Sequence, residues 1–400
     1  MMKYKAFLIG LAFNFLLAIF ACYLLDPYGF YRKIEIKRLN QQKEGVRNVI
    51  RYVKAIEVGL RKPQTILMGS SRVHDGINPQ NSVLQKYAPV YNYGIDMLRI
   101  NEAKYYLKHA IINGNIKRVI FGLDFFMFNS LEKFNPAFDS TLVGRKLNFI
   151  DMLKPCLPSK YVVTDIYNTI NISRTQPERM EFLANGYRPG SSVFYHLQDY
   201  KKLHYYTNWI FLSNDKQATP YYGRYVQNEQ TFKCFEDFLD ICRRNNIECI
   251  LFITPAHALL DGEGIHLTGL WDKMEDFKRN VTKIACEKNA VIWDFSGYNY
   301  VTTESLKNPM KYYWDSSHYK ESIGNLMMEQ MMMPQLNNSA YFGTRLTEKN
   351  IEQHLKEIRT DREKYLKSNQ VDVTWINQLY NRIKENKGIP KEQTENIFAK

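Results

Sequence analysis

The order of apolar and polar positions predicts short buried strands that alternate with amphipathic helices. Apolar runs occur at 65–68, 90–92, 118–121, 248–254 and 290–294, and the first three are followed closely by a glycine. Continuous apolar runs of this length are typical of strands buried on both faces. Helical patterns separate them at 101–112, 232–244 and 273–288. We therefore expect an α/β domain with a mostly parallel sheet, helices on both of its faces and right-handed crossovers.

The longest apolar run lies near the start of the chain, at residues 6–25, with Asn14 as its only clearly polar member. Twenty such residues are enough to cross a bilayer as a helix. We predict a membrane anchor within residues 1–29. A cleaved signal peptide is the main alternative, but no small-x-small cleavage site follows the run. Lipidation of Cys22 is disfavoured by the bulky Phe20 two residues earlier.

The rest of the chain divides into three parts. Residues 30–62 form a juxtamembrane segment, in which a helix is indicated by apolar residues at i, i+3, i+4 and i+7, namely Val46, Val49, Ile50 and Val53. Residues 63–335 hold the α/β pattern, interrupted at about 126–228 by an aromatic-rich insertion. The insertion could be a lid, a sugar-stacking wall or a helical subdomain with packed tyrosines. Residues 336–400 are a charged helical extension, with Leu355, Ile358 and Tyr365 as candidate core contacts.

Charge and cysteine content narrow the function classes. The net charge of +13 suits an anionic partner such as an acidic polysaccharide or lipid headgroups. Because of the predicted anchor, we expect no nucleic-acid partner. Residues 30–62 contain ten Lys or Arg against three acids, which favours a cytoplasmic flank. The six cysteines include no CxxC pair, and Cys234 and Cys242 would lie about 12 Å apart along a helix. We expect no disulfide framework, no metal site and no cofactor.

Two distant motifs together supply the groups for nucleophilic catalysis. Gly69-Ser70-Ser71-Arg72 follows the first predicted strand, and Asp315-Ser316-Ser317-His318 lies late in the chain. A serine hydroxyl becomes a useful nucleophile when an imidazole accepts its proton and a carboxylate orients that imidazole. Ser71, His318 and Asp315 are our candidates for these roles. Alternatives are Ser70 as the nucleophile, both serines as helix caps, or His318 as a core histidine.

Other candidate residues follow from the expected sheet. Ligands bind beyond the carboxyl ends of parallel strands, where Ser71, Gly94 and Asp124 all fall. Arg72 could bind a substrate carboxylate, although an exposed arginine beside a turn is the commoner case. His257, after the fourth strand, could also contact substrate. His74 is expected to face solvent.

These motifs resemble the SGNH, or GDSL-like, hydrolase superfamily over residues 63–335. Met68-Gly69-Ser70-Ser71-Arg72 matches the first block, Asn92-Tyr93-Gly94 the second, and Asp315-x-x-His318 the last; Tyr319 and Gly324 also fit. The resemblance implies a flavodoxin-like three-layer sandwich and an oxyanion hole formed by Ser71, Gly94 and the third-block residue. That residue is Asp124 instead of the usual asparagine. An ionised carboxylate would repel an oxyanion, so either Asp124 is protonated or it has another role.

Within the superfamily the chain is similar to membrane-anchored proteins that take part in O-acetylation of bacterial polysaccharides such as alginate. This similarity implies a single-pass inner-membrane protein with a periplasmic domain. It implies an acyl group, expected to be acetyl, transferred through Ser71 to a cell-envelope polysaccharide, with a multi-pass membrane acyltransferase as donor partner. The alternatives are an envelope acetyl-ester hydrolase and a non-catalytic polysaccharide-binding or assembly protein.

Overall fold

The centre of the molecule is a six-stranded sheet with the order β2-β1-β3-β4-β5-β6. The computed structural model describes residues 2–131, 134–157, 159–179, 182–194, 196–336 and 338–398. The first five strands are parallel neighbours and confirm the five predicted strands. The last strand pairs antiparallel with β5 and was not predicted. The strands are β1 (Thr65–Gly69), β2 (Val90–Gly94), β3 (Arg118–Leu123), β4 (Glu248–Ile253), β5 (Val291–Asp294) and β6 (Thr344–Leu346).

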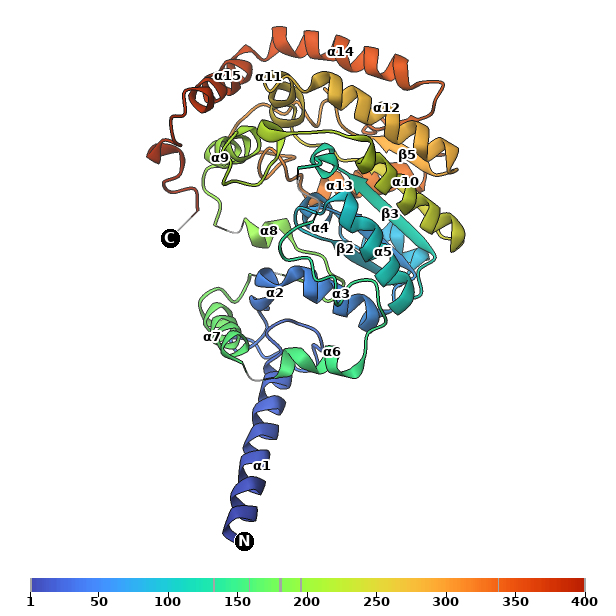
Figure 1. Ribbon diagram of the computed structural model, residues 1–400. Helices are drawn as coiled ribbons and strands as arrows, with labels where there is room; N and C mark the ends of the chain where they lie inside the picture. Colours follow the sequence, from blue (N-terminus) through green and yellow to red (C-terminus); the bar gives the residue numbers. More distant parts are fainter. Residues whose placement is uncertain are drawn as a thin grey trace.

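Helices fill the connections between the strands (Figure 1). The predicted helices at 101–112, 232–244 and 273–288 are confirmed as α5, α10 and α12. The α-helices are α1 (Met2–Leu25), α2 (Gly45–Asn48), α3 (Ile50–Arg61), α4 (Ser71–Gly76), α5 (Ile100–Asn113), α6 (Phe149–Leu153), α7 (Lys160–Thr175), α8 (Gly190–Val193), α9 (Tyr200–Leu212), α10 (Glu229–Arg244), α11 (Ile265–Leu267), α12 (Trp271–Glu287), α13 (Glu321–Met332), α14 (Ile351–Ser368) and α15 (Gln370–Lys384). Short helical turns are η1 (Ser82–Tyr87), η2 (Phe125–Phe128), η3 (Lys154–Cys156), η4 (Tyr222–Arg224), η5 (Ala258–Gly264) and η6 (Lys391–Gln393).

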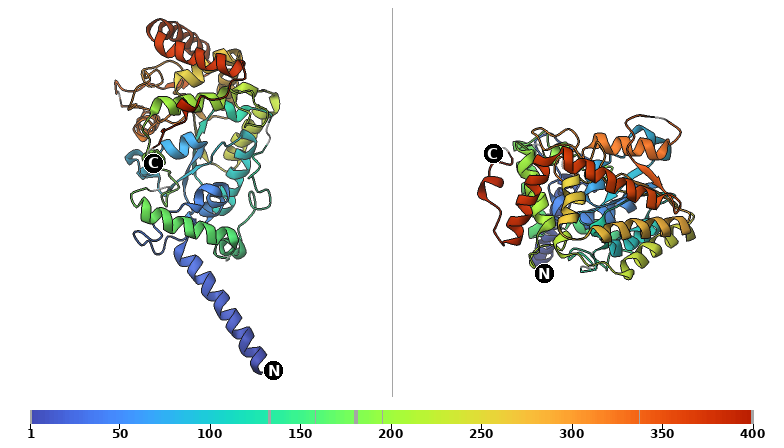
Figure 2. Two further views of the ribbon diagram at one scale, coloured as in Figure 1. Left: turned by 90° about the vertical axis from the view of Figure 1, so that its left-hand side faces the viewer. Right: turned by 90° about the horizontal axis from the view of Figure 1, so that it is seen from above.

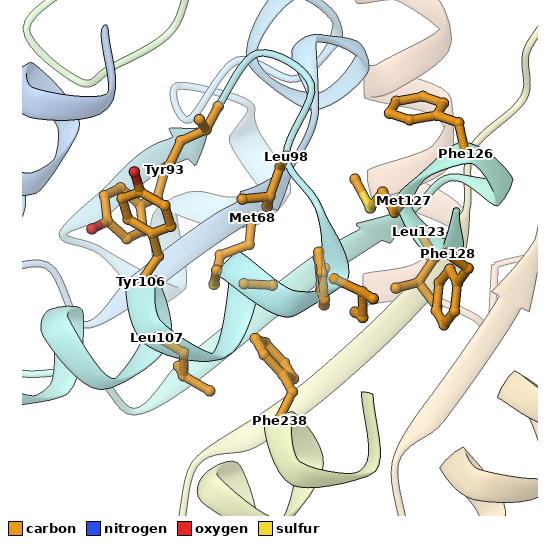
Figure 3. Close-up of a cluster of buried hydrophobic side chains, with 14 of the residues drawn as sticks. Met68, Tyr93, Leu98, Tyr106, Leu107, Leu123, Phe126, Met127, Phe128 and Phe238 are labelled. Atoms are coloured by element: carbon orange, nitrogen blue, oxygen red, sulfur yellow. The ribbon is translucent and has the colours of Figure 1, made fainter. Parts of the chain in front are cut away.

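The two faces of the sheet bury separate sets of apolar side chains, because successive residues of a strand point to opposite faces. Ile66 and Met68 of β1 join the larger cluster, which includes residues of α3, α5, α10 and α12. Leu67 joins the smaller cluster, which includes the methionines of α13. Figure 3 shows part of the larger cluster, with Phe238 of α10 beneath α5. The structure therefore confirms a mostly parallel sheet covered by helices on both faces.

Helix α1 projects from one end of the molecule (Figure 1). Residues 4–25 are long and apolar enough to cross a membrane and are almost entirely outside the folded core. Hydrogen bonds hold the segment that connects α1 to the domain. The buried carboxylate of Asp26 accepts N–H bonds from Phe30, Tyr31 and Arg32 at 3.0, 3.0 and 2.8 Å.

The insertion and the C-terminal extension pack against the rest of the chain. Within the insertion, α6 and α7 lie near the base of α1, while α9 contacts α15. The extension supplies β6 as well as α14 and α15. Leu355, Ile358 and Tyr365 are buried as predicted, and Ile376 and Leu379 belong to the larger core cluster. The C-terminal extension is thus part of the same packed body as the sheet.

Candidate active site

Ser71, His318 and Asp315 lie together in a hydrogen-bonded row. His318 Nε2 is 2.8 Å from Ser71 Oγ, and His318 Nδ1 is 2.8 Å from Asp315 Oδ2. Ser71 is partly exposed, and the side chain of His318 is 20% exposed. Asp315 is buried. The candidate nucleophile, base and orienting carboxylate are therefore in contact at a point that solvent can reach.

The end of β1 places the serine. Gly69 has a φ of +151°, and a Cβ there would lie 2.3 Å from Val73 Cγ2, so the close approach of strand and helix requires glycine. Ser70 then caps α4, because its side chain accepts the Arg72 N–H at 3.2 Å. Ser70 is fully buried. The structure thus gives the two serines different roles, with Ser70 as the cap and Ser71 facing His318.

Backbone bonds hold the loop that carries Asp315 and His318. Asp315 Oδ1 accepts the N–H groups of Ser317 and His318 at 2.6 and 2.7 Å. Behind it, the Ser316 hydroxyl is 2.8 Å from Nδ1 of the buried His204. Burial lowers the pKa of His204 well below its ordinary value, so this ring is neutral. These contacts fix the carboxylate beside its histidine.

The charges in the row favour an ionised carboxylate. Burial opposes the ionisation of Asp315, but His318 and its N–H bond more than offset this, and the pKa of Asp315 is lowered. Burial likewise opposes the charging of His318, yet the Asp315 carboxylate prevails and raises the pKa of His318 above its ordinary 6.5. His318 therefore accepts a proton more readily than a free imidazole.

Arg72 is neither an exposed arginine nor a ligand for a substrate carboxylate in this structure. Its guanidinium is buried and contacts Asp124 and Asp261 at 3.0 and 2.9 Å. Its Nε donates to Ser317 Oγ at 3.0 Å, so it ties α4 to the histidine loop. Asp261, more than a hundred residues away in η5, belongs to no motif, and the sequence offered no signal for it.

The Asp124 side chain pairs with Arg72, so it has a contact other than the one expected of the third-block residue. Besides Arg72, its carboxylate accepts a bond from the Thr254 hydroxyl at the end of β4. Burial raises the pKa of Asp124, although the Arg72 charge acts in the opposite direction. Asp124 Oδ1 is thus engaged by both Arg72 and Thr254.

The two expected amide donors of the oxyanion hole differ. Ser71 is the first residue of α4, where a backbone N–H has no partner within the helix. The Gly94 N–H, in contrast, donates to Asn92 Oδ1 at 2.9 Å. Asn92 is itself held by bonds from its amide to the Val73 and Ile77 carbonyls. In this arrangement the Ser71 amide is the available donor.

His257 does not face the site as a substrate ligand. It is fully buried, its Nε2 is 2.6 Å from the Glu304 carbonyl, and its Nδ1 accepts the Leu259 N–H. Burial lowers its pKa to about 4. The backbone N–H of His257 donates to the Ser316 carbonyl at 3.0 Å, so His257 supports the loop that carries Asp315 and His318.

His74 is also buried, contrary to the expectation of a solvent-facing ring. Its two ring nitrogens lie 2.7 Å from Asp75 and 2.6 Å from Asp96. Burial disfavours the charged ring, but the two carboxylates raise the pKa of His74. The Asp96 side chain is 40% exposed; burial opposes its ionisation, but the charge and hydrogen bond of His74 lower its pKa, with smaller contributions from Arg188 and His318. An anionic group therefore lies close to the proposed base.

No group of three or more His, Cys, Asp or Glu within the described ranges is arranged to hold a metal ion. All six cysteines, each of them within those ranges, are free thiols.

Comparison with known proteins does not assign the chain to a family. No protein-family model and no curated protein matches the chain. One similar solved structure is described as "The structure of a putative platelet activating factor from Streptococcus pneumonia". It is 10% identical, covers 74% of this chain and 94% of its own, and has a TM-score of 0.32. A TM-score this low supports no statement about the chemistry of this chain.

Proposed function

We propose that the protein is a serine-dependent acyltransferase. The observation that carries the proposal is the row of contacts from Ser71 through His318 to Asp315. His318 accepts the Ser71 proton as Oγ attacks the acyl carbonyl, and Asp315 holds the imidazole and stabilises its charge. The Ser71 N–H stabilises the oxyanion. His318 then gives the proton to the leaving group, whose bond to the acyl carbon breaks. The first product departs, and an ester remains on Ser71.

The acyl-enzyme then passes its group to an acceptor hydroxyl. His318, now neutral, takes the proton of the acceptor hydroxyl as the acceptor oxygen attacks the Ser71 ester. The bond between Ser71 Oγ and the acyl carbon then breaks, and His318 returns the proton to Oγ. The strand order β2-β1-β3-β4-β5 is that of flavodoxin-like sheets, which is consistent with the SGNH resemblance. That resemblance, and not the geometry, is the source of acetyl as the acyl group and of a periplasmic envelope polysaccharide as the acceptor.

Labelling of the nucleophile tests the proposal. The full-length protein in detergent is treated with a fluorophosphonate, and the peptide that holds Ser70 and Ser71 is analysed by mass spectrometry. We expect wild type and Ser70→Ala to be labelled, and Ser71→Ala and His318→Ala to be unlabelled. A folded wild type that stays unlabelled would refute the enzyme and favour the polysaccharide-binding or assembly alternative.

Transfer and hydrolysis are separated in a second step. The protein is acetylated with an activated acetyl ester that carries an isotopic label, then given water alone or an anionic polysaccharide. Faster loss of the label from Ser71 with polysaccharide, together with labelled glycan, supports transfer. An equal rate in both cases would identify an ester hydrolase.

A further inference from the structure

The end of the molecule from which α1 projects carries an apolar surface that the acyl chemistry does not use. In Figure 1 and in the left view of Figure 2, α6 and α7 lie beside the base of α1, and α1 contacts both η3 and α7. Large side chains of α6 and α7 are open to solvent: Phe149 is 71% exposed, Ile150 70%, Tyr161 79% and Tyr167 70%. We call these four residues the apolar rim.

A cavity of about 550 Å³ opens beside the rim. Its walls come from α3, α5, the 137–143 segment and the start of α7, and most of them are apolar or aromatic. Tyr161 and Leu157 line the cavity and are also exposed, so the cavity reaches the surface next to η3 and hence next to α1. Its size and lining are those of a site for an apolar ligand. The other apolar or aromatic walls include Tyr52, Tyr106, Leu142, Val143 and Val162.

Polar groups in the cavity indicate the kind of ligand. The hydroxyl of Tyr106 is buried and has no hydrogen-bond partner among the described residues. Lys154 is exposed at the edge. Two other charged residues are already engaged: Arg51 pairs with Glu102 at 2.9 Å, and Asp139 accepts the Thr141 hydroxyl. One donor inside and one cation at the mouth would suit an apolar chain with an anionic head.

We propose that this cavity binds an acyl chain of an anionic phospholipid, drawn from the bilayer that α1 crosses. A helix that spans the membrane places the rim at the lipid headgroups, where exposed aromatic and aliphatic side chains bind the interface. The chain enters past Tyr161, the Tyr106 hydroxyl donates to the ester carbonyl, and Lys154 lies by the headgroup. The exposed cations of the segment that follows α1, among them Lys33, Lys37 and Arg38, favour an anionic leaflet.

Lipid retention tests the cavity. Full-length protein is incubated in detergent with phosphatidylglycerol or phosphatidylcholine, freed of excess lipid, and its bound phospholipid is measured by mass spectrometry. We expect wild type to retain phosphatidylglycerol and Val162→Trp, which fills the cavity, to lose most of it. Val371→Trp is the matched control, because Val371 is exposed on α15 at the opposite end from α1. Wild type without lipid, or a folded Val162→Trp that retains as much, would overturn the proposal.

A second measurement avoids any change to the core. Tyr161→Trp and Val371→Trp are placed in nanodiscs whose phosphatidylglycerol carries bromine on the acyl chains, and the added emission is taken as the difference from wild type. We expect the bromine to quench most of the emission from position 161 and none of that from position 371. Replacing Lys154 by Gln should weaken quenching by brominated phosphatidylglycerol more than by brominated phosphatidylcholine. Equal emission from positions 161 and 371 in brominated lipid would contradict membrane contact at the cavity.

Discussion

Asp315→Asn isolates the orienting role of the carboxylate, because it changes one atom in the row. The new side chain keeps an oxygen that can accept the N–H bonds of Ser317 and His318, now made to Oδ1 at 2.6 and 2.7 Å. Its amide nitrogen, however, takes the place of Oδ2, which lies 2.8 Å from His318 Nδ1. An N–H donor at that point favours the tautomer with Nδ1 unprotonated. The proton then lies on Nε2, where it faces Ser71 as a donor and cannot accept the serine proton.

The expected loss follows from this wrong tautomer. Serine enzymes in which the carboxylate is replaced by an amide lose roughly 10⁴-fold in kcat, which corresponds to about 5 kcal/mol of transition-state free energy. A second effect concerns pH. The raised pKa of His318 places the rise of activity above pH 6.5 in wild type, since the base must be neutral. Without the Asp315 charge, the pKa falls and the rise moves to lower pH.

The assay is the rate of acylation of Ser71 by an activated acetyl ester, followed across pH in the full-length protein. Asp237→Asn on the surface of α10 serves as the control for a charge change alone, because the side chain of Asp237 is 36% exposed and pairs with the partly exposed Lys104 and the exposed Lys233. The reasoning would be refuted if Asp315→Asn acylated within tenfold of wild type with an unshifted pH profile.

Three further predictions concern the core and the buried ion pairs. Asp294→Asn should lower the free energy of unfolding in urea by about 3–5 kcal/mol, because the buried Lys278, 2.6 Å away, loses its anionic partner and keeps only neutral contacts such as the Ser296 hydroxyl. Because the pKa of Asp294 is lowered in the fold, wild type should also lose this stability as the pH falls below 3.8, and the variant should not. Phe238→Ala should lower the free energy of unfolding by about 3–5 kcal/mol in the same measurement. An unchanged free energy of unfolding would contradict the place of Phe238 in the core. Arg72→Lys, which loses the bond to Ser317, should slow acylation about 10²-fold with little change in the reagent's KM; a loss confined to KM would contradict a positioning role.

The sequence predicted those parts of the fold that are encoded locally. Each parallel strand is a run of apolar residues buried on both faces, so β1 to β5 were found within a few residues of their ends. Strand β6 was missed because Thr344 to Leu346 is short and carries an exposed arginine, and it is a strand only through its pairing with β5. The helical character of the C-terminal extension was predicted, but its division into α14 and α15 was not.

The site could be predicted only as far as its motifs reach. Ser71, Asp315 and His318 were chosen because their residue types and spacing fit one chemistry. The partners of Arg72 lie 52 and 189 residues away, and no pattern near Arg72 indicates them. Asn92, which accepts the Gly94 N–H, shows the same limit, since its side chain is held by the Val73 and Ile77 carbonyls, 19 and 15 residues away. Such contacts are decided by tertiary packing and not by local sequence.

The bonds around Asp26 have a consequence for how the protein meets its substrates. Three N–H groups bonded to the Asp26 carboxylate, together with the contacts of α1 with η3 and α7, fix the segment that connects α1 to the domain in one conformation. If α1 spans a bilayer, this connection would hold Ser71 at one height above the membrane and in one orientation. Ser71 could not then move through the space above the membrane, so the acyl donor and the acceptor of the proposed reaction would have to reach that height. A flexible segment inserted after Asp26 would release this constraint and broaden the range of acceptors within reach.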